Sequence, residues 1–197
     1  MKPDPIAHFK KISNLLIHTE VTGQDGKALS LEIGIASAAD KILREEGKIM
    51  VIGNGGSAAI ASHLQNDLCK AVGARAMVFN EPPLLTALSN DHGYGCVFER
   101  PIELWAESRD LLIAISCSGE SENVLRGVRV AKVKGCEIMT FSGFQSDNSL
   151  RRAGDLNFYI SSQSYGEVEV SHMALTHFLT DYTMTVRPGA RKVAAPS

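Results

Sequence analysis

Hydrophobic positions in the first quarter of the chain recur at the spacing of amphipathic helices. A predicted helix over residues 6–19 carries on one face Ile6, Phe9, Ile12, Leu15 and Leu16. A second predicted helix over residues 28–47 carries on one face Leu31, Ile35, Ala38, Ala39 and Ile42. Two glycines interrupt the pattern between them, within residues 21–27. We therefore predict an N-terminal helical hairpin that packs at a subunit interface.

From residue 48 onward, short apolar runs alternate with helical patterns. The predicted strands cover residues 48–53, 75–79, 110–116, 136–143 and 156–161. The predicted helices cover residues 57–72, 83–91, 121–135 and 166–186. Strands that alternate with helices indicate a parallel sheet with helices on both faces. The predicted fold class is therefore α/β, a flavodoxin-like three-layer sandwich with a five-stranded parallel sheet, preceded by the N-terminal helical hairpin.

The length of the chain, 197 residues, allows one domain with a sizeable core. We predict a single domain over residues 1–187, made of N-terminal helices (1–47) and an α/β core (48–187). Residues 188–197 are predicted to be a disordered tail. Parallel sheets bind ligands beyond the carboxyl ends of their strands, so we expect a site in the loops after Ile52, Ile115, Phe141 and Ile160.

The composition argues against several classes of protein. A formal net charge of −2 gives no sign of a general nucleic-acid or membrane surface. No apolar run is long enough to span a bilayer, and the first residues lack the apolar core of a signal peptide. The four cysteines, none of them in a C-x-x-C pair, are Cys69, Cys96, Cys117 and Cys136. A zinc ribbon or redox motif is therefore not expected, and reduced thiols favour a cytoplasmic protein.

A glycine-rich loop, GNGGSA (residues 53–58), joins the first predicted strand of the core to its helix. The dinucleotide fingerprint G-x-G-x-x-G requires a glycine where Ala58 stands, and no Gly-Lys-Ser/Thr follows as in a P-loop. What remains is a set of glycines that let backbone N–H groups approach a ligand, with Ser57 at the helix start. Taken alone, the loop is as consistent with a capped turn as with a binding site.

A second loop, SCSGESEN (residues 116–123), places three serines before a predicted helix: Ser116, Ser118 and Ser121. Hydroxyls and free N–H groups at the positive end of a helix dipole form an anion site. One serine is enough to cap a helix, so three favour a binding function. The loop contains no lysine or arginine, which favours a phosphate monoester held by neutral donors.

Two pairs of histidines and carboxylates occur at helical spacing. His63 and Asp67 are four residues apart, so both project from one helix face. Glu169 and His177 are eight residues apart, about two turns, and again share a face. Together they are candidates for zinc ligation or acid/base chemistry, although a solvated helix face explains either pair alone. The other histidines are expected to pack or cap (His172) or to lie on the surface (His8, His18 and His92).

These motifs, in this order, resemble the sugar isomerase (SIS) domain family, and within it the phosphoheptose isomerases. The resemblance covers about residues 5–186 and is carried by GNGGSAAIASH, LSNDHGYGCVFER, ISCSGESENV with AKVKGCEIMTFSG, and VEVSHMALTHFL. It implies conversion of sedoheptulose 7-phosphate to glycero-manno-heptose 7-phosphate, in the heptose supply for lipopolysaccharide. It also implies a homotetramer with sites between subunits.

The resemblance also assigns roles to matching positions. It implies a catalytic pair of Asp67 and His177. It implies one zinc ion per subunit, bound by His63, Asp67, Glu169 and His177. The substrate-binding positions that it implies are Asn54, Gly55, Gly56, Ser57, Asn90, Asp91, Ser116, Cys117, Ser118, Ser121 and Glu169.

Several positions depart from the family pattern. Asp67 stands where the family usually has a glutamate base, Glu169 where it usually has a glutamine ligand, and Cys117 where it has a threonine. An arginine that the family often carries just after this first core helix is missing near Lys70. Two alternatives therefore stay open beside the heptose phosphate isomerase. One is an isomerase of another phosphosugar, and the other is a non-catalytic SIS protein that binds a phosphosugar or associates with the replication initiator DnaA.

Overall fold

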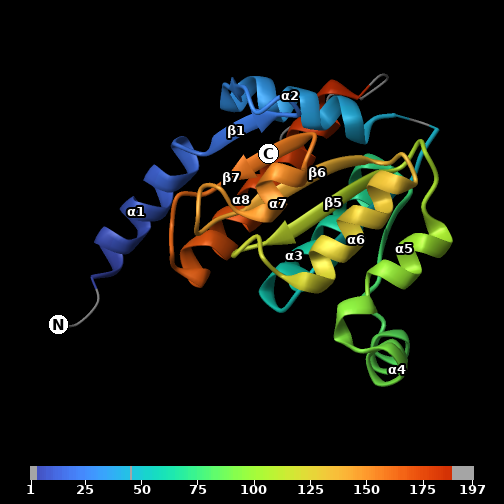
Figure 1. The fold of residues 1–197 in the computed structure, drawn as a ribbon. Helices are drawn as coiled ribbons and strands as arrows, with labels where there is room; N and C mark the ends of the chain where they lie inside the picture. Colours follow the sequence, from blue (N-terminus) through green and yellow to red (C-terminus); the bar gives the residue numbers. More distant parts are fainter. Residues whose placement is uncertain (1–3, 45, 188–197) are drawn as a thin grey trace.

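A seven-stranded sheet in the order β2-β1-β7-β6-β5-β3-β4 forms the centre of the molecule (Figure 1). The computed structural model describes residues 4–44 and 46–187, so the predicted tail at 188–197 lies outside the described residues. The strands are β1 (Glu20–Gly23), β2 (Ala28–Leu29), β3 (Ile49–Gly53), β4 (Ala76–Val78), β5 (Leu111–Ser116), β6 (Glu137–Ser142) and β7 (Leu156–Tyr159). Neighbours from β4 to β7 pair parallel, whereas β1 pairs antiparallel with both β2 and β7.

The five parallel strands run in the order β4-β3-β5-β6-β7, which is 2-1-3-4-5 when they are numbered along the chain. This is the flavodoxin-like order, so the predicted α/β class is confirmed. The whole sheet has seven strands and not the predicted five, because β1 and β2 extend it. The strand order reverses between β3 and β5, and open α/β sheets bind ligands outside the carboxyl ends at such a point. Because β3 ends at Gly53 and β5 at Ser116, the glycine and serine loops both start there.

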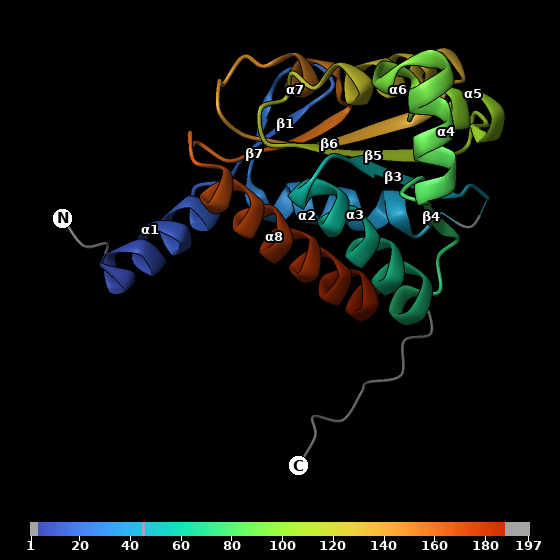
Figure 2. The ribbon, with the colours of Figure 1, turned by 90° about the horizontal axis from the view of Figure 1, so that it is seen from below.

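Helices cover both faces of the sheet, as Figure 2 shows. One face carries α2 (Leu31–Ile42), α3 (Gly56–Asp67) and α8 (Tyr165–Val186), and the other carries α5 (Glu99–Trp105), α6 (Glu122–Val133) and α7 (Ser149–Ala153). Successive strand residues point to opposite faces. In β3, Val51 joins the hydrophobic cluster under α3 and α8, whereas Ile52 joins the cluster under α5 and α6. These two clusters hold the helices that start at the glycine and serine loops.

The N-terminal region differs from the predicted helical hairpin. A β-hairpin of β1 and β2 separates α1 (Pro5–Ile17) from α2 and extends the sheet beyond β7. Val21 of β1 is buried against α2, where a Cβ atom on Gly34 would lie 2.6 Å from Val21 Cγ1. α1 packs on α8 and projects from the body of the molecule (Figure 1). The prediction of a helical hairpin was wrong because β1 buries a single side chain, which leaves little pattern in the sequence.

Short elements outside the strong periodic patterns were also not predicted. They are α5, α7 and the 3-10 turn η2 (Tyr94–Cys96). The predicted helix after the glycine loop is present, but beyond Asp67 it continues as a single π-helical turn, η1 (Leu68–Val72). Throughout residues 4–44 and 46–187, every helix is too short or too polar to span a bilayer.

Candidate active site

Two helices begin at one cavity beyond the carboxyl ends of β3 and β5. α3 begins within the glycine loop, at Gly56, and α6 begins within the serine loop, at Glu122. The cavity has a volume of about 240 Å³ and is lined by Asn54, Gly55, Gly56, Ser57, Ser116, Cys117, Ser118, Ser121, Tyr165 and Glu169. Every predicted substrate-binding residue except Asn90 and Asp91 is in this lining.

The serine loop leaves hydrogen-bond donors free for a ligand. Ser116 Oγ accepts a hydrogen bond from Gly119 N and lies 3.2 Å from Ser121 Oγ. Ser118 Oγ accepts a hydrogen bond from Glu120 N at 3.2 Å. Ser121 is the N-cap residue of α6, but its side chain makes no capping hydrogen bond. An anion at this position therefore gains the first-turn N–H groups, the hydroxyls and the helix dipole together.

The turn of the serine loop requires a glycine. Gly119 has a φ of +67°, a conformation that residues with a side chain rarely adopt. A Cβ atom at this position would lie 2.0 Å from Oδ1 of Asn148. Asn148 is itself buried and donates to the carbonyl oxygens of Gly143 and Gln145. The loop is therefore held in one shape by the segment that follows β6.

Asn54 of the glycine loop is bound to α6. Its side-chain amide exchanges two hydrogen bonds of 2.8 Å with the amide of Asn123, and Tyr94 Oη donates to Asn54 Oδ1 at 3.1 Å. Asn123 is almost completely buried. This amide pair fixes the start of α3 relative to the start of α6.

Three residues of this site were missed from the sequence: Asn123, Tyr94 and Tyr165. Tyr165 opens α8 and lines the cavity. Isolated polar or aromatic residues carry no periodic pattern. The one available signal was the position of Asn123, two residues after the third serine of the loop.

Ser57, Cys117 and Glu169 meet in the cavity. Cys117 Sγ lies 3.9 Å from Ser57 Oγ and 4.0 Å from Glu169 Oε1. Burial raises the pKa of the Cys117 thiol to about 11, so the thiol stays protonated at neutral pH. Cys117 is therefore a small neutral group in this cavity and not a nucleophile.

A second group of side chains lies farther along α3 and α8. His63 and Asp67 of α3 and His177 of α8 bring three ligand atoms within 4.8 Å of one another. Asp67 Oδ2 lies 3.2 Å from His63 Nε2 and 3.6 Å from His177 Nδ1, and the imidazole centroids are 4.5 Å apart. The Asp67 side chain is 20% exposed, whereas both histidines are nearly half exposed. Solvent and a substrate can therefore reach a carboxylate that lies between two imidazoles.

Glu169 does not join this group, contrary to the expected set of four zinc ligands. Eight residues of helix separate it from His177, which at a rise of about 1.5 Å per residue amounts to about 12 Å. Its carboxylate lies against α3 instead, where a Cβ atom on Gly56 would be 2.4 Å from both carboxylate oxygens. The spacing places Glu169 and His177 two helical turns apart on α8, but the Glu169 side chain is turned toward Gly56 and not toward the histidines.

Asn90 and Asp91 do not line the cavity either. Both are exposed at the end of α4 (Pro82–His92), and Asn90 Nδ2 donates to Asp91 Oδ1 at 2.9 Å. α4 stands away from the sheet (Figure 1), held through its partly buried Leu85 and Leu88. Within the described residues of one chain, neither side chain reaches the 240 Å³ cavity. The predicted contact of these two residues with a substrate therefore has no support from a single chain.

His172 is a core residue, as its position off the functional face predicted. It is fully buried, and its Nε2 lies 3.1 Å from the carbonyl oxygen of Ser142. Burial lowers the pKa of His172 to about 4, so the ring is neutral at physiological pH.

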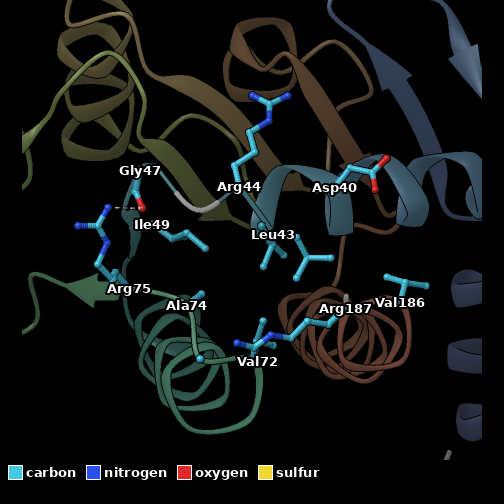
Figure 3. Close-up of a pocket in the computed structure, with 12 residues that line it drawn as sticks. Asp40, Leu43, Arg44, Gly47, Ile49, Val72, Ala74, Arg75, Val186 and Arg187 are labelled. Atoms are coloured by element: carbon cyan, nitrogen blue, oxygen red, sulfur yellow. Dashed lines mark hydrogen bonds between the residues drawn. The ribbon is translucent and has the colours of Figure 1, made fainter. Parts of the chain in front are cut away.

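A larger cavity, of about 580 Å³, lies at the opposite, amino-terminal edge of the sheet (Figure 3). Its walls are the ends of α2, η1 and α8, and the described residues that line it include neither histidine nor cysteine. Arg75 Nη2 donates to the carbonyl of Gly47 at 3.2 Å, and the Arg187 guanidinium lies against Gly73. Arg187 directly follows α8, where a positive charge stabilises the helix C-terminus, and Arg75 satisfies the carbonyls of Glu46 and Gly47 before β3, so the fold accounts for both arginines. The candidate site is therefore the 240 Å³ cavity together with the His63, Asp67 and His177 group.

Comparisons with known proteins show which proteins the chain is similar to. The SIS domain family matches residues 23–143. The phosphoheptose isomerase of Campylobacter concisus is 34% identical over 177 residues, which cover 87% of this chain and 88% of the relative. That of Thermodesulfovibrio yellowstonii is 31% identical over 173 residues, covering 83% and 86%. Among solved structures, the phosphoheptose isomerase of Neisseria gonorrhoeae superposes with a TM-score of 0.76 at 25% identity, covering 92% of this chain and 97% of the other.

Proposed function

The chain belongs to the SIS domain family and is a phosphosugar isomerase, and on that premise we propose that it interconverts sedoheptulose 7-phosphate and glycero-manno-heptose 7-phosphate. One observation carries the proposal. A phosphate-type cavity and a carboxylate between two imidazoles lie along the same two packed helices, α3 and α8. An open-chain sugar phosphate has its anionic group at one end and its reacting carbonyl toward the other, and this arrangement suits both ends.

The phosphate binds at the start of α6. The donors there are the hydroxyls of Ser116, Ser118 and Ser121 and the N–H groups of the first helical turn. The cavity lining contains no arginine, lysine or histidine among the described residues. Neutral donors bind a phosphate less tightly than an arginine clamp, which allows the product to leave.

Asp67 and His177 move the protons of the reaction. Asp67 takes a proton from carbon 1 of the ketose and returns it to carbon 2, and the electron pair passes through an enediol. His177 protonates the oxygen on carbon 2 and accepts the proton from the oxygen on carbon 1. The 3.6 Å between His177 Nδ1 and Asp67 Oδ2 keeps both groups beside the same pair of carbons. His63 lies on the other side of the carboxylate, with its Nε2 3.2 Å from Asp67 Oδ2.

A divalent metal ion suits the same three side chains. His63 Nε2 is buried and has no hydrogen-bond partner among the described residues, although Asp67 Oδ2 lies 3.2 Å away. Two imidazoles and one carboxylate are a common catalytic zinc set that keeps a coordination position open. Zinc bound there would polarise the substrate carbonyl. We propose His63, Asp67 and His177 as its ligands, with Glu169 outside the set.

Metal analysis tests this ligand set. We expect the purified chain, dialysed against zinc and then buffer, to retain about one zinc ion per chain. His63→Ala should lose it, because two remaining ligands bind zinc weakly. His92→Ala, which removes an exposed histidine of α4, is the matched control and should retain the ion. Equal zinc content in His63→Ala and the unaltered chain, measured by plasma mass spectrometry, would exclude the proposed ligands.

Replacing Ser121 tests the phosphate position. We expect Ser121→Ala to raise KM about tenfold with kcat changed less than about threefold, because a hydrogen bond to a charged group contributes roughly 1.5–3 kcal/mol. Steady-state kinetics measure both constants. Ser108→Ala, on an exposed loop at the opposite edge of the sheet, is the control. An unchanged KM in Ser121→Ala would contradict the proposal that the phosphate binds at the start of α6.

We also propose that the chain forms a homotetramer with sites between subunits, as the resemblance implies. α1 supports self-association, since Ile6, Phe9 and Ile17 are all more than 60% exposed on it. In such an assembly, Asn90 and Asp91 are free to reach the site of a neighbouring subunit. We propose that they contact the substrate there. Light scattering that gives the mass of a monomer would contradict this. The cytoplasmic location stays a prediction from the sequence.

A panel of sugar phosphates tests the substrate assignment. Purified enzyme is incubated with sedoheptulose 7-phosphate, fructose 6-phosphate and ribulose 5-phosphate, and the aldose products are measured. We expect kcat/KM to be highest for the seven-carbon substrate. A higher kcat/KM for a shorter sugar phosphate would leave the isomerase activity standing and contradict the seven-carbon substrate. Binding without conversion of any member would favour a sensor of phosphosugars.

A further inference from the structure

Phe144, in the loop between β6 and α7, has a backbone conformation that its side chain disfavours. Its φ is +59°, and among the residues that the structure describes it is the sole non-glycine residue with a positive φ. A bulky residue in the left-handed region is an outlier, because its Cβ atom lies too close to the following carbonyl oxygen. Such strained residues persist where their surroundings fix them, and they cluster at functional sites.

Backbone hydrogen bonds on both sides hold Phe144 in this conformation. Its N–H donates to the carbonyl oxygen of Ser162 at 2.9 Å, and its own carbonyl oxygen accepts from Tyr159 Oη at 2.7 Å. The residue before it, Gly143, donates its N–H to the carbonyl oxygen of Cys117 in the serine loop at 3.0 Å. The backbone of Phe144 is therefore fixed between the serine loop and the segment that precedes α8.

The ring of Phe144 contacts the ring of Tyr165, the first residue of α8. The two centroids lie 4.8 Å apart at an interplanar angle of 68°, an edge-to-face arrangement that aromatic pairs favour. Phe144 is half-buried and packs against the core, whereas Tyr165 is 62% exposed. Tyr165 also lines the 240 Å³ cavity, so its side chain lies between the cavity and solvent. A ring anchored in the core thus supports an exposed ring at the rim of the cavity.

The position of Tyr165 suits the phosphate end of a substrate. It is the one aromatic residue among the described residues that line the cavity, and it precedes His177 by more than three helical turns of α8. The cavity offers a phosphate only neutral donors, as described above. Such hydrogen bonds weaken when water competes for the phosphate oxygens and strengthen when water is excluded. A ring at the rim can exclude that water.

We propose, on the basis of the function proposed above, that Tyr165 is a substrate-binding residue and that Phe144 is its positioning residue. The ring of Tyr165 covers the phosphate at the rim of the cavity and keeps water from the hydrogen bonds of the serine loop. Phe144 holds that ring in place through the edge-to-face contact. A glycine in place of Phe144 would relieve the backbone strain but leave Tyr165 without its support.

Calorimetric titration with sedoheptulose 7-phosphate, together with steady-state kinetics, tests the role of Tyr165. We expect Tyr165→Ala to raise Kd and KM about tenfold and to change kcat less than about threefold, because the lost binding is the same in the ground state and the transition state. Tyr165→Phe keeps the ring and should stay within about twofold of the unaltered chain. Trp105→Ala, which removes an exposed ring at the end of α5, is the matched control and should leave both constants unchanged.

A double-variant comparison tests whether Phe144 acts through Tyr165. Phe144→Ala should raise Kd about fivefold in the unaltered chain and cause no further change in Tyr165→Ala, because two residues that act as one unit are not additive. Phe144→Gly should bind as weakly as Phe144→Ala but have the higher Tm, since glycine adopts a positive φ without strain. A Tm of Phe144→Gly no higher than that of Phe144→Ala would contradict the strain at this position.

The outcomes separate this role from the proposed function. If Tyr165→Ala binds sedoheptulose 7-phosphate as tightly as the unaltered chain, or if Tyr165→Phe loses as much affinity as Tyr165→Ala, the ring does not cover the phosphate, while the proposed function stands. If Phe144→Ala weakens binding equally with and without Tyr165, Phe144 is not its positioning residue. An unaltered chain that neither binds nor converts sedoheptulose 7-phosphate contradicts the proposed function, and the role of Tyr165 with it.

Discussion

Replacing Asp67 with asparagine is expected to lower kcat by about 10² to 10⁴, the usual contribution of a positioned acid or base. Asparagine has nearly the same shape, so the packing of α3 is retained, but its amide does not accept the proton from carbon 1. KM should change little, because Asp67 lies apart from the serine loop that we propose binds the phosphate. His177→Ala should cause a loss of similar size through the proton transfers between the two oxygens.

The control for Asp67→Asn is Asp40→Asn, which removes an exposed carboxylate from α2. Steady-state turnover of sedoheptulose 7-phosphate by the three variants and the unaltered chain gives the comparison. Retained activity in both Asp67→Asn and His177→Ala would contradict the assignment of these two residues as the acid/base pair. A loss of activity in His177→Ala alone would indicate that His177, and not Asp67, is the base.

The second large effect is expected from acid, through the buried His172. Its folded-state pKa is about 4, whereas an unfolded histidine titrates near 6.5. The unfolded chain therefore binds a proton between these pH values that the folded chain does not, and the free energy of unfolding falls as the pH drops through this window. From pH 7 to pH 5 the loss is about 2 kcal/mol, which for a chain of this size lowers Tm by roughly 4–8 °C.

The pH window isolates His172 from the carboxylates. Ion pairs and hydrogen bonds lower the pKa of Glu167, whose contribution to stability is present above its unfolded pKa and is lost only as the pH falls below it. Thermal unfolding between pH 5 and 7 should therefore show a slope that His172→Gln removes and that His92→Gln, at an exposed site, leaves in place. A titration of the His172 ring by NMR gives an independent measurement, and a pKa near 6.5 would contradict the prediction.

Much of the fold was predictable because its core strands are fully buried. β3 and β5 bury every residue, so each gave a continuous apolar run that the helical patterns separated. The edge elements gave weaker signals. β1 buries only Val21, and α5 is a short helix with Pro101 in its first turn, so neither contrasts with a loop in the sequence.

The site was predictable to the extent that it is built from local segments. The glycine and serine loops each lie in one stretch of sequence, and helical spacing was enough to pair His63 with Asp67. Contacts between elements were less predictable. Nothing local indicates that Asn54 pairs with Asn123 or that Glu169 lies against Gly56 instead of beside His177, because those contacts depend on how α3, α6 and α8 pack.

Turnover of sedoheptulose 7-phosphate in deuterium oxide, followed by NMR, tests the central claim most directly. Proton transfer through an enediol predicts that the aldose forms and carries solvent deuterium at carbon 2, and that Asp67→Asn suppresses both signals together. Tight binding of the ketose with no aldose formed would contradict an isomerase. Formation of the aldose at an unchanged rate in Asp67→Asn would contradict the site on which the account depends.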